Sequence, residues 1–164
     1  MVNQPNPSGK YSLRAMRASD LDRAIALEVT LFGNQAWSYG MLAEELGGPG
    51  RWYIVATYRD LASIGPEPVV GYAGLWFDGE VTQIMTVGVD PHHQGRGAGR
   101  RLIEALIARS REVGASAVLL EVAVHNEAAL HLYASYGFEQ LGLRKRYYQP
   151  GDVDAYTMRL DLAP

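Results

Sequence analysis

The sequence predicts a mixed α/β fold with one central sheet. Its 164 residues are the usual length of a single domain, and 48% of them are apolar, which is enough to fill one core. Short segments rich in β-forming residues alternate with segments whose apolar residues recur at helical spacing, and no internal repeat is present. We therefore expect about seven strands flanked by about four helices in one domain over residues 11–164, preceded by a disordered tail over residues 1–10.

Seven segments have the composition of β-strands. They cover residues 11–16, 52–58, 69–77, 81–89, 117–124, 138–145 and 155–162. Asp78-Gly79 is a hairpin turn signal between the third and the fourth segment. Because seven of the eight residues in 117–124 are apolar, this segment is expected in the centre of the sheet, covered on both faces.

Four segments have the apolar spacing and the boundary residues of helices. The first follows an N-cap at Ser19-Asp20 and ends at Gly33, and the second follows Ser38. The third begins after a glycine-rich turn and ends near Gly114. The fourth follows Asn126, and one of its faces carries Ala129, Leu132, Tyr133 and Tyr136.

Composition narrows the classes of function. A formal net charge of −3 gives no general attraction to nucleic acid or anionic lipid, so neither is expected as the main ligand. The absence of cysteine removes disulfides, thiolate metal sites and a cysteine nucleophile. No apolar run approaches the roughly 20 residues needed to cross a bilayer. A soluble cytoplasmic protein is the simplest interpretation, and His92-His93, without spaced acidic partners, does not predict a metal site.

A glycine-rich turn, Gln94-Gly95-Arg96-Gly97-Ala98-Gly99-Arg100, joins the fourth strand to the third helix. Such a turn lets backbone N–H groups approach an anion, and the helix N-terminus adds partial positive charge, to which Arg96, Arg100 and Arg101 add full charges. The segment lacks the Lys-Ser/Thr of a P-loop and the sixth-position glycine of the dinucleotide fingerprint. It predicts a pyrophosphate site of another kind. The alternative is a turn that leads into a solvated, basic helix start.

Val87-Gly88-Val89-Asp90-Pro91 followed by this turn resembles the acetyl-CoA motif of the GCN5-related N-acetyltransferases (GNAT). The resemblance implies the GNAT fold, whose sheet splays between its central strands, and acetyl-CoA as cosubstrate with no metal. It implies that the turn holds the pyrophosphate of CoA through the backbone of Gln94, Gly95, Arg96, Gly97, Ala98, Gly99 and Arg100. It also implies that the preceding strand bulges and pairs with the pantetheine arm through Val87 and Val89, on either side of Gly88.

Segments 120–122, 126–138, 144–148 and 154–158 resemble the RimI subgroup of this family, and the similarity covers residues 13–160. This implies an acyltransferase that acetylates the N-terminal α-amino group of a protein, small-subunit ribosomal protein number eighteen. Departures at Ala36, Ala123 and His125 lie on the acceptor side. Two alternatives remain open: the same chemistry on another amine, and a non-catalytic module that binds acetyl-CoA or RNA.

Glu121 is the candidate general base. An N-terminal amine has a pKa of about 7.7–8.0, so a modest base suffices to neutralise it. Glu121 is the lone charge in an apolar strand, where an unpaired carboxylate is costly and burial favours its role as a base. The alternatives are a carboxylate paired with a nearby arginine and one exposed at the end of the strand.

Other roles follow from the resemblance. Tyr133 is implied as the general acid near the CoA sulfur, although a tyrosine at helical spacing is more often a core residue. Asn126 is expected to cap its helix and to bond the pantetheine arm. The developing oxyanion is expected to meet the backbone N–H of Val89. Trp37, Tyr147, Tyr148 and Asp154 are implied as the acceptor-binding residues, with simple packing and loop charges as the alternative.

Overall fold

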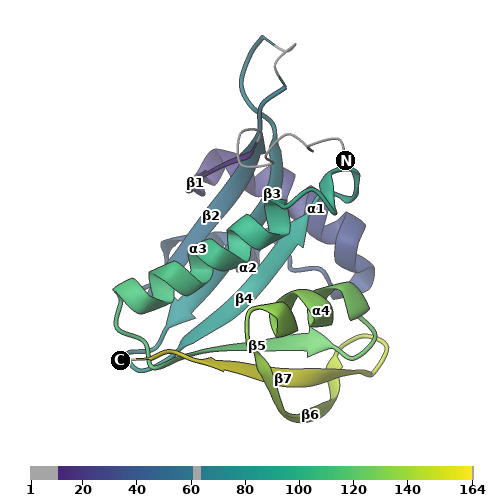
Figure 1. Ribbon diagram of the computed structural model, residues 1–164. Helices are drawn as coiled ribbons and strands as arrows, with labels where there is room; N and C mark the ends of the chain where they lie inside the picture. Colours follow the sequence, from purple (N-terminus) through teal and green to yellow (C-terminus); the bar gives the residue numbers. More distant parts are fainter. Residues whose placement is uncertain (1–10, 61–63, 164) are drawn as a thin grey trace, which may run out of the picture.

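The computed structural model describes residues 11–60 and 64–163. The predicted tail over residues 1–10 and part of the predicted loop over residues 60–68 lie outside the described residues. Seven strands form one sheet in the order β1-β2-β3-β4-β5-β7-β6 (Figure 1). They are β1 (Tyr11–Ala15), β2 (Arg51–Tyr58), β3 (Val69–Phe77), β4 (Thr82–Val89), β5 (Ala117–Ala123), β6 (Glu139–Tyr148) and β7 (Val153–Asp161).

Four α-helices cover the two faces of the sheet, α3 and α4 on one face and α1 and α2 on the other (Figure 1). They are α1 (Leu21–Phe32), α2 (Tyr39–Gly47), α3 (Ala98–Glu112) and α4 (Glu127–Ser135), with short 3-10 turns η2 (Ala18–Asp20), η3 (Gly33–Gln35) and η4 (Pro91–His93). The predicted mixed sheet with about four helices is confirmed. None of the helices in the described ranges is long and apolar enough to span a bilayer.

Alternation along the strands divides the apolar side chains between two cores. Ile54 and Ala56 of β2 join the α3 and α4 core, and Tyr53 and Val55 join the α1 and α2 core. Because successive side chains of a strand point to opposite faces, one strand can supply both cores. The sheet is therefore fixed from both sides along β2 and β3.

The sheet splits between β4 and β5. These parallel strands pair only at Thr82 with Val118 and at Gln83 with Leu119. Just beyond, Gly74 pairs with Thr86 and Leu75 with Ile84, so that Met85 is an extra residue that bulges from β4. The predicted bulge and splay are both present, and they open a gap in the middle of the sheet.

Three local expectations need correction. The Asp20 side chain does not cap α1, because it accepts hydrogen bonds from the Arg14 guanidinium and from the backbone N–H of Arg17. β5 is not covered on both faces: Val118, Leu120 and Val122 are buried, whereas Glu121 on the opposite face is only partly buried. The sixth strand extends to Tyr148, three residues past its predicted end, because Tyr148 pairs with Val153 of β7 beyond a register shift that follows Arg144.

Candidate active site

The glycine-rich turn presents free backbone donors at the start of α3. Gly95 and Gly97 have φ of +74° and +96°, a region that glycine enters without strain. The N–H of Arg101 donates to the carbonyl of Gly97 at 3.1 Å and begins the helix ladder. The N–H groups of Ala98, Gly99 and Arg100 precede this bond, so they have no acceptor within the helix. We refer to these three N–H groups as the anion cradle; that they hold a phosphate stays a prediction.

The three arginines of the turn have different surroundings. Arg96 and Arg100 are exposed, and the Arg100 guanidinium stacks on Tyr136 with its central carbon 5.5 Å from the ring centroid. Arg101 instead donates to the backbone carbonyl of Tyr11 on β1. Arg96 and Arg100 are therefore the better candidates to contact a phosphate, and Arg101 ties the start of α3 to β1.

The backbone of β4 offers an unpaired edge to the gap. The N–H of Asp90 donates to Val70 of β3 at 2.8 Å. Because backbone groups alternate sides along a strand, those of Val87 and Val89 point the other way, toward the side that β5 leaves open. The carbonyl of Val89 is already used, since it accepts a hydrogen bond from Nε2 of Gln94 at 3.1 Å. Val89 thus retains only its N–H for a ligand, whereas Val87 retains both groups.

Together these groups fit acetyl-CoA. A pyrophosphate needs clustered N–H donors and positive charge, which the cradle and its two arginines supply. A pantetheine arm carries amide groups, which can pair with an open strand edge as a further strand would. Gly88 lies within this edge under Tyr72, and a Cβ at Gly88 would be only 2.5 Å from the Tyr72 hydroxyl oxygen.

A cavity of about 120 Å³ lies where the sheet splits. Its lining residues are Trp37, Gln83, Ile84, Met85, Glu121, Tyr147 and Tyr148. Four residues predicted for catalysis or acceptor binding thus meet in one place, from separate parts of the chain. A water molecule occupies about 30 Å³, so the cavity suits a small group. A larger hollow of about 290 Å³, lined by α3 together with Tyr136 and Leu160, includes none of these four residues.

Glu121 is paired and also lines the cavity. Its side chain is 10% exposed, and its Oε1 lies 3.3 Å from Nη1 of Arg144. Its Oε2 accepts a hydrogen bond of 2.7 Å from the Thr157 hydroxyl. Pairing with an arginine, which the sequence left open as the alternative, is therefore present. It does not exclude catalysis, because Glu121 also lines the cavity.

The tyrosines near the cavity are kept protonated by burial. Burial raises the pKa of Tyr148 to about 12, and its hydroxyl donates to the backbone carbonyl of Glu121 at 3.2 Å. Burial also raises the pKa of Tyr133, whose ring packs against Phe138 at 5.6 Å between centroids. Within the described residues the Tyr133 hydroxyl has no hydrogen-bond partner. The Tyr133 ring thus packs in the core, while its hydroxyl remains able to donate to another group.

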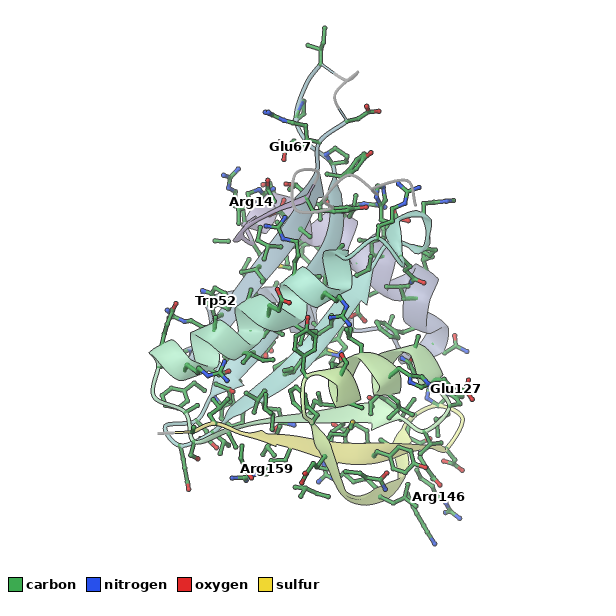
Figure 2. All side chains as sticks on the ribbon, in the orientation of Figure 1. Arg14, Trp52, Glu67, Glu127, Arg146 and Arg159 are labelled. Carbon is green, nitrogen blue, oxygen red and sulfur yellow. The ribbon has the colours of Figure 1, made fainter. Side chains whose placement is uncertain are left out.

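Two predicted residues have structural contacts outside the cavity. Asn126 caps α4 as expected, accepting the N–H of Ala129 at 3.2 Å. Asp154 does not line the cavity; its carboxylate accepts the backbone N–H of Arg146 at 2.9 Å. Arg146 has a φ of +56° and lies at the edge of the molecule formed by β6 and β7 (Figure 2). Asp154 therefore shapes the β6–β7 turn.

Glu28 on α1 is a site residue that the sequence analysis missed. It is 2% exposed, and its Oε1 accepts hydrogen bonds from the hydroxyls of Tyr72 at 2.8 Å and Thr86 at 2.6 Å. Its Oε2 accepts the backbone N–H of Trp37 at 3.1 Å. Glu28 thus joins α1, the bulged strand and the cavity wall. One feature of the sequence could have indicated its burial. Glu28 follows Leu21 by seven residues, or two helical turns, and so lies on the buried face of α1.

The adjacent histidines of η4 have no metal partners. His93 Nδ1 lies 3.1 Å from the hydroxyl of Tyr11, and its ring packs on Tyr58 with centroids 4.8 Å apart. Over residues 11–60 and 64–163 no group of three or more His, Asp or Glu side chains could hold a metal ion. His93 therefore fastens the start of the turn to β1 and β2.

Comparison with known proteins agrees with this geometry. The chain is 39% identical over 155 residues to the N-alpha-acetyltransferase RimI of Mycobacterium tuberculosis, with 92% of each chain covered. The crystal structure of the ribosomal-protein-S18-alanine N-acetyltransferase from Escherichia coli matches with a TM-score of 0.78 and 26% identity, over 94% of this chain and 95% of that one.

The fold also matches Arabidopsis thaliana NAA60 in complex with acetyl-CoA, with a TM-score of 0.83 and 19% identity over 93% of this chain and 98% of that one. The model of the acetyltransferase (GNAT) family matches residues 34–138, from η3 to the residue before β6. The RimI-like relatives agree with the resemblance seen in segments 120–158. The chain therefore belongs to the GNAT family of acetyltransferases, and it is a RimI-like acyltransferase of that family.

Proposed function

We propose that this chain acetylates the N-terminal α-amino group of small-subunit ribosomal protein number eighteen. The observation that carries the proposal is the small cavity at the split of the sheet, which combines Glu121 with Trp37, Tyr147 and Tyr148 beside the open edge of β4. The similarity to an N-alpha-acetyltransferase of Mycobacterium tuberculosis and to the ribosomal-protein-S18-alanine N-acetyltransferase of Escherichia coli supports the same class of acceptor. Under this proposal the protein acts in the cytoplasm, where ribosomes are found. Residues 11–164 then form one acetyltransferase domain.

Each residue has a definite part in the proposed reaction. When bound, acetyl-CoA supplies an acetyl thioester that an amine can attack. The donors of Ala98, Gly99 and Arg100 hold its pyrophosphate, and Val87 and the Val89 N–H hold its arm. Asn126 contributes a further polar contact to that arm.

Proton transfer falls to two side chains. Glu121 accepts the proton of the attacking amine, either directly or through one water, and the neutral amine then acts as nucleophile. The Val89 N–H stabilises negative charge on the acetyl oxygen. Tyr133, held protonated by burial, donates to the departing sulfur, whose thiol pKa is about 8.5.

The size of the cavity favours an acceptor whose first residue is small. A space of about 120 Å³ between aromatic side chains accommodates an amine with a methyl-sized neighbour more readily than one with a large side chain. Trp37, Tyr147 and Tyr148 wall this space, and Asp154 keeps the β6–β7 turn in shape behind them.

An acceptor screen tests the proposal. We expect thiol release from acetyl-CoA with a peptide that carries the N-terminal alanine of the ribosomal protein, and little with the same peptide beginning with leucine or tryptophan. A peptide with a blocked N-terminus and an internal lysine, and a polyamine, serve as competing acceptors. Faster turnover with either of these would reject the N-terminal assignment, and binding of acetyl-CoA without any turnover would favour a non-catalytic module.

A further inference from the structure

Arg144 joins the candidate base to the candidate acceptor-binding surface. Its Nη1 lies 3.3 Å from Oε1 of Glu121, and its guanidinium carbon lies 5.2 Å from the centroid of the Tyr147 ring. The Arg144 side chain is 57% exposed and that of Glu121 only 10%, so the cation lies outside and the carboxylate inside. One side chain thus contacts two walls of the same cavity.

Thr157 holds the other oxygen of the carboxylate. The antiparallel register of β5 and β7 places Thr157 directly opposite Glu121, and its hydroxyl donates to Oε2 at 2.7 Å. Each carboxylate oxygen therefore has one donor from the protein. A carboxylate offers about four lone-pair positions, so about two remain available to an acceptor amine.

No other charged side chain lines this cavity among the described residues. The lining residues on β4 and before α2 are uncharged: Gln83, Ile84, Met85 and Trp37. The titratable neighbours on β6 are Tyr147 and Tyr148, which burial keeps protonated. Arg144, which does not itself line the cavity, is therefore the cation that the Glu121 carboxylate meets.

We propose that Arg144 on β6 and Thr157 on β7 are positioning residues for acetyl transfer, which hold the Glu121 carboxylate of β5 in one orientation. Arg144 also fixes Tyr147, so the base and the acceptor-binding ring are held by the same side chain. A carboxylate held from two sides loses little rotational freedom when the amine arrives, and precise placement of a base affects the rate strongly. This inference rests on the proposed function.

The first experiment compares single variants. Arg144→Met and Thr157→Val each remove one donor and keep the size of the side chain, and Arg144→Lys keeps the charge without the planar group. Arg159→Met is the matched control, because Arg159 lies on β7 in an ion pair with Asp161 and does not line the cavity. We expect Arg144→Met and Thr157→Val to lower kcat by about tenfold with an unchanged KM for acetyl-CoA. Arg144→Lys is expected to recover part of the loss.

The second experiment asks whether Arg144 acts through Glu121. Residues that act as one unit have non-additive effects, so Arg144→Met should cause no further loss of kcat in a Glu121→Gln background. Both backgrounds are compared at about pH 7.5, where a fair fraction of the acceptor amine is neutral without a base, so that turnover by Glu121→Gln stays measurable. A role confined to folding would instead lower the thermal midpoint and would add to the loss in that background.

The outcomes separate this inference from the proposed function. If Glu121→Gln lowers kcat but Arg144→Met and Thr157→Val match the Arg159→Met control, the positioning role is wrong and the proposed function stands. An equal loss from Arg144→Met in both backgrounds would also overturn the role. If Glu121→Gln has no effect on N-terminal acetylation, both the assigned base and this inference fail, while the acceptor screen still decides the substrate.

Discussion

Substitution of Glu28 by Gln tests the buried hydrogen-bond group that supports the cavity wall. The carboxylate accepts three hydrogen bonds, two at Oε1 and one at Oε2, and all three partners are donors. An amide has only one acceptor oxygen. If that oxygen keeps the hydroxyls of Tyr72 and Thr86, the amide NH2 group faces the N–H of Trp37, donor against donor.

The expected cost follows from these contacts. A buried donor left without an acceptor costs about 1–3 kcal/mol, and each of the two remaining bonds loses about 1 kcal/mol when its acceptor is no longer charged. The lower cost of burying an uncharged group opposes these losses. We expect a net loss of about 2 kcal/mol, which corresponds to a fall of about 4–8 °C in the thermal midpoint of a chain of this length.

Thermal unfolding followed by circular dichroism measures this change. Glu127→Gln is the matched control, because Glu127 is exposed at the start of α4 (Figure 2) and its substitution should change stability by no more than about 0.5 kcal/mol. Kinetics provide a second readout: the freed Trp37 backbone should raise the KM for the acceptor and leave that for acetyl-CoA unchanged. A midpoint equal to that of Glu127→Gln would refute the reasoning.

Three further predictions concern the cofactor turn, the bulged strand and acid stability. Arg96→Glu should weaken acetyl-CoA binding by about tenfold in calorimetry at an unchanged thermal midpoint, and an unchanged affinity would contradict the assigned phosphate contact. Gly88→Ala should lower stability by about 1–3 kcal/mol in urea unfolding, because its Cβ would meet the buried Tyr72 at 2.5 Å. Hydrogen bonds from Arg14 hold the pKa of Asp20 below its usual value. The Asp20 carboxylate therefore stabilises the fold above about pH 4, and this stabilisation is lost as the pH falls through the pKa of the folded state. Asp20→Asn should therefore be less stable at pH 7 and lose less stability between pH 7 and pH 3, and a parallel curve would count against the ion pair.

The sequence predicted the elements wherever local patterns determine them. Caps at Ser38 and Asn126 are present as expected, because an N-cap is a contact between near neighbours in the chain. The strand over 138–145 was placed too short because its predicted end lies within the exposed basic run Arg144-Lys145-Arg146, whereas the strand continues to Tyr148. Only the pairing with β7 makes that continuation a strand, and no local pattern reports it.

The cofactor turn could be predicted more fully than the surroundings of the base. The turn is one continuous segment, so its glycines and arginines indicate an anion site by themselves. The contacts of Glu121 come instead from the registers of β5 with β7 and of β6 with β7, which bring Thr157 and Arg144 to the carboxylate. Register between strands far apart in sequence depends on the whole sheet. Glu28 was missed because its helix face was judged from its apolar residues alone.

The split between β4 and β5 affects the stability of the protein and its tendency to associate with other chains. An unpaired strand edge is a template on which another chain can add, and most proteins cover such edges. Under the proposed function, acetyl-CoA covers this one as a substitute strand. A cosubstrate present at one hundred times its Kd would add about 2.7 kcal/mol to the stability of the folded chain. The amount of folded enzyme would then rise and fall with the concentration of acetyl-CoA. At low acetyl-CoA the enzyme would be inactive, and its uncovered strand edge would favour self-association.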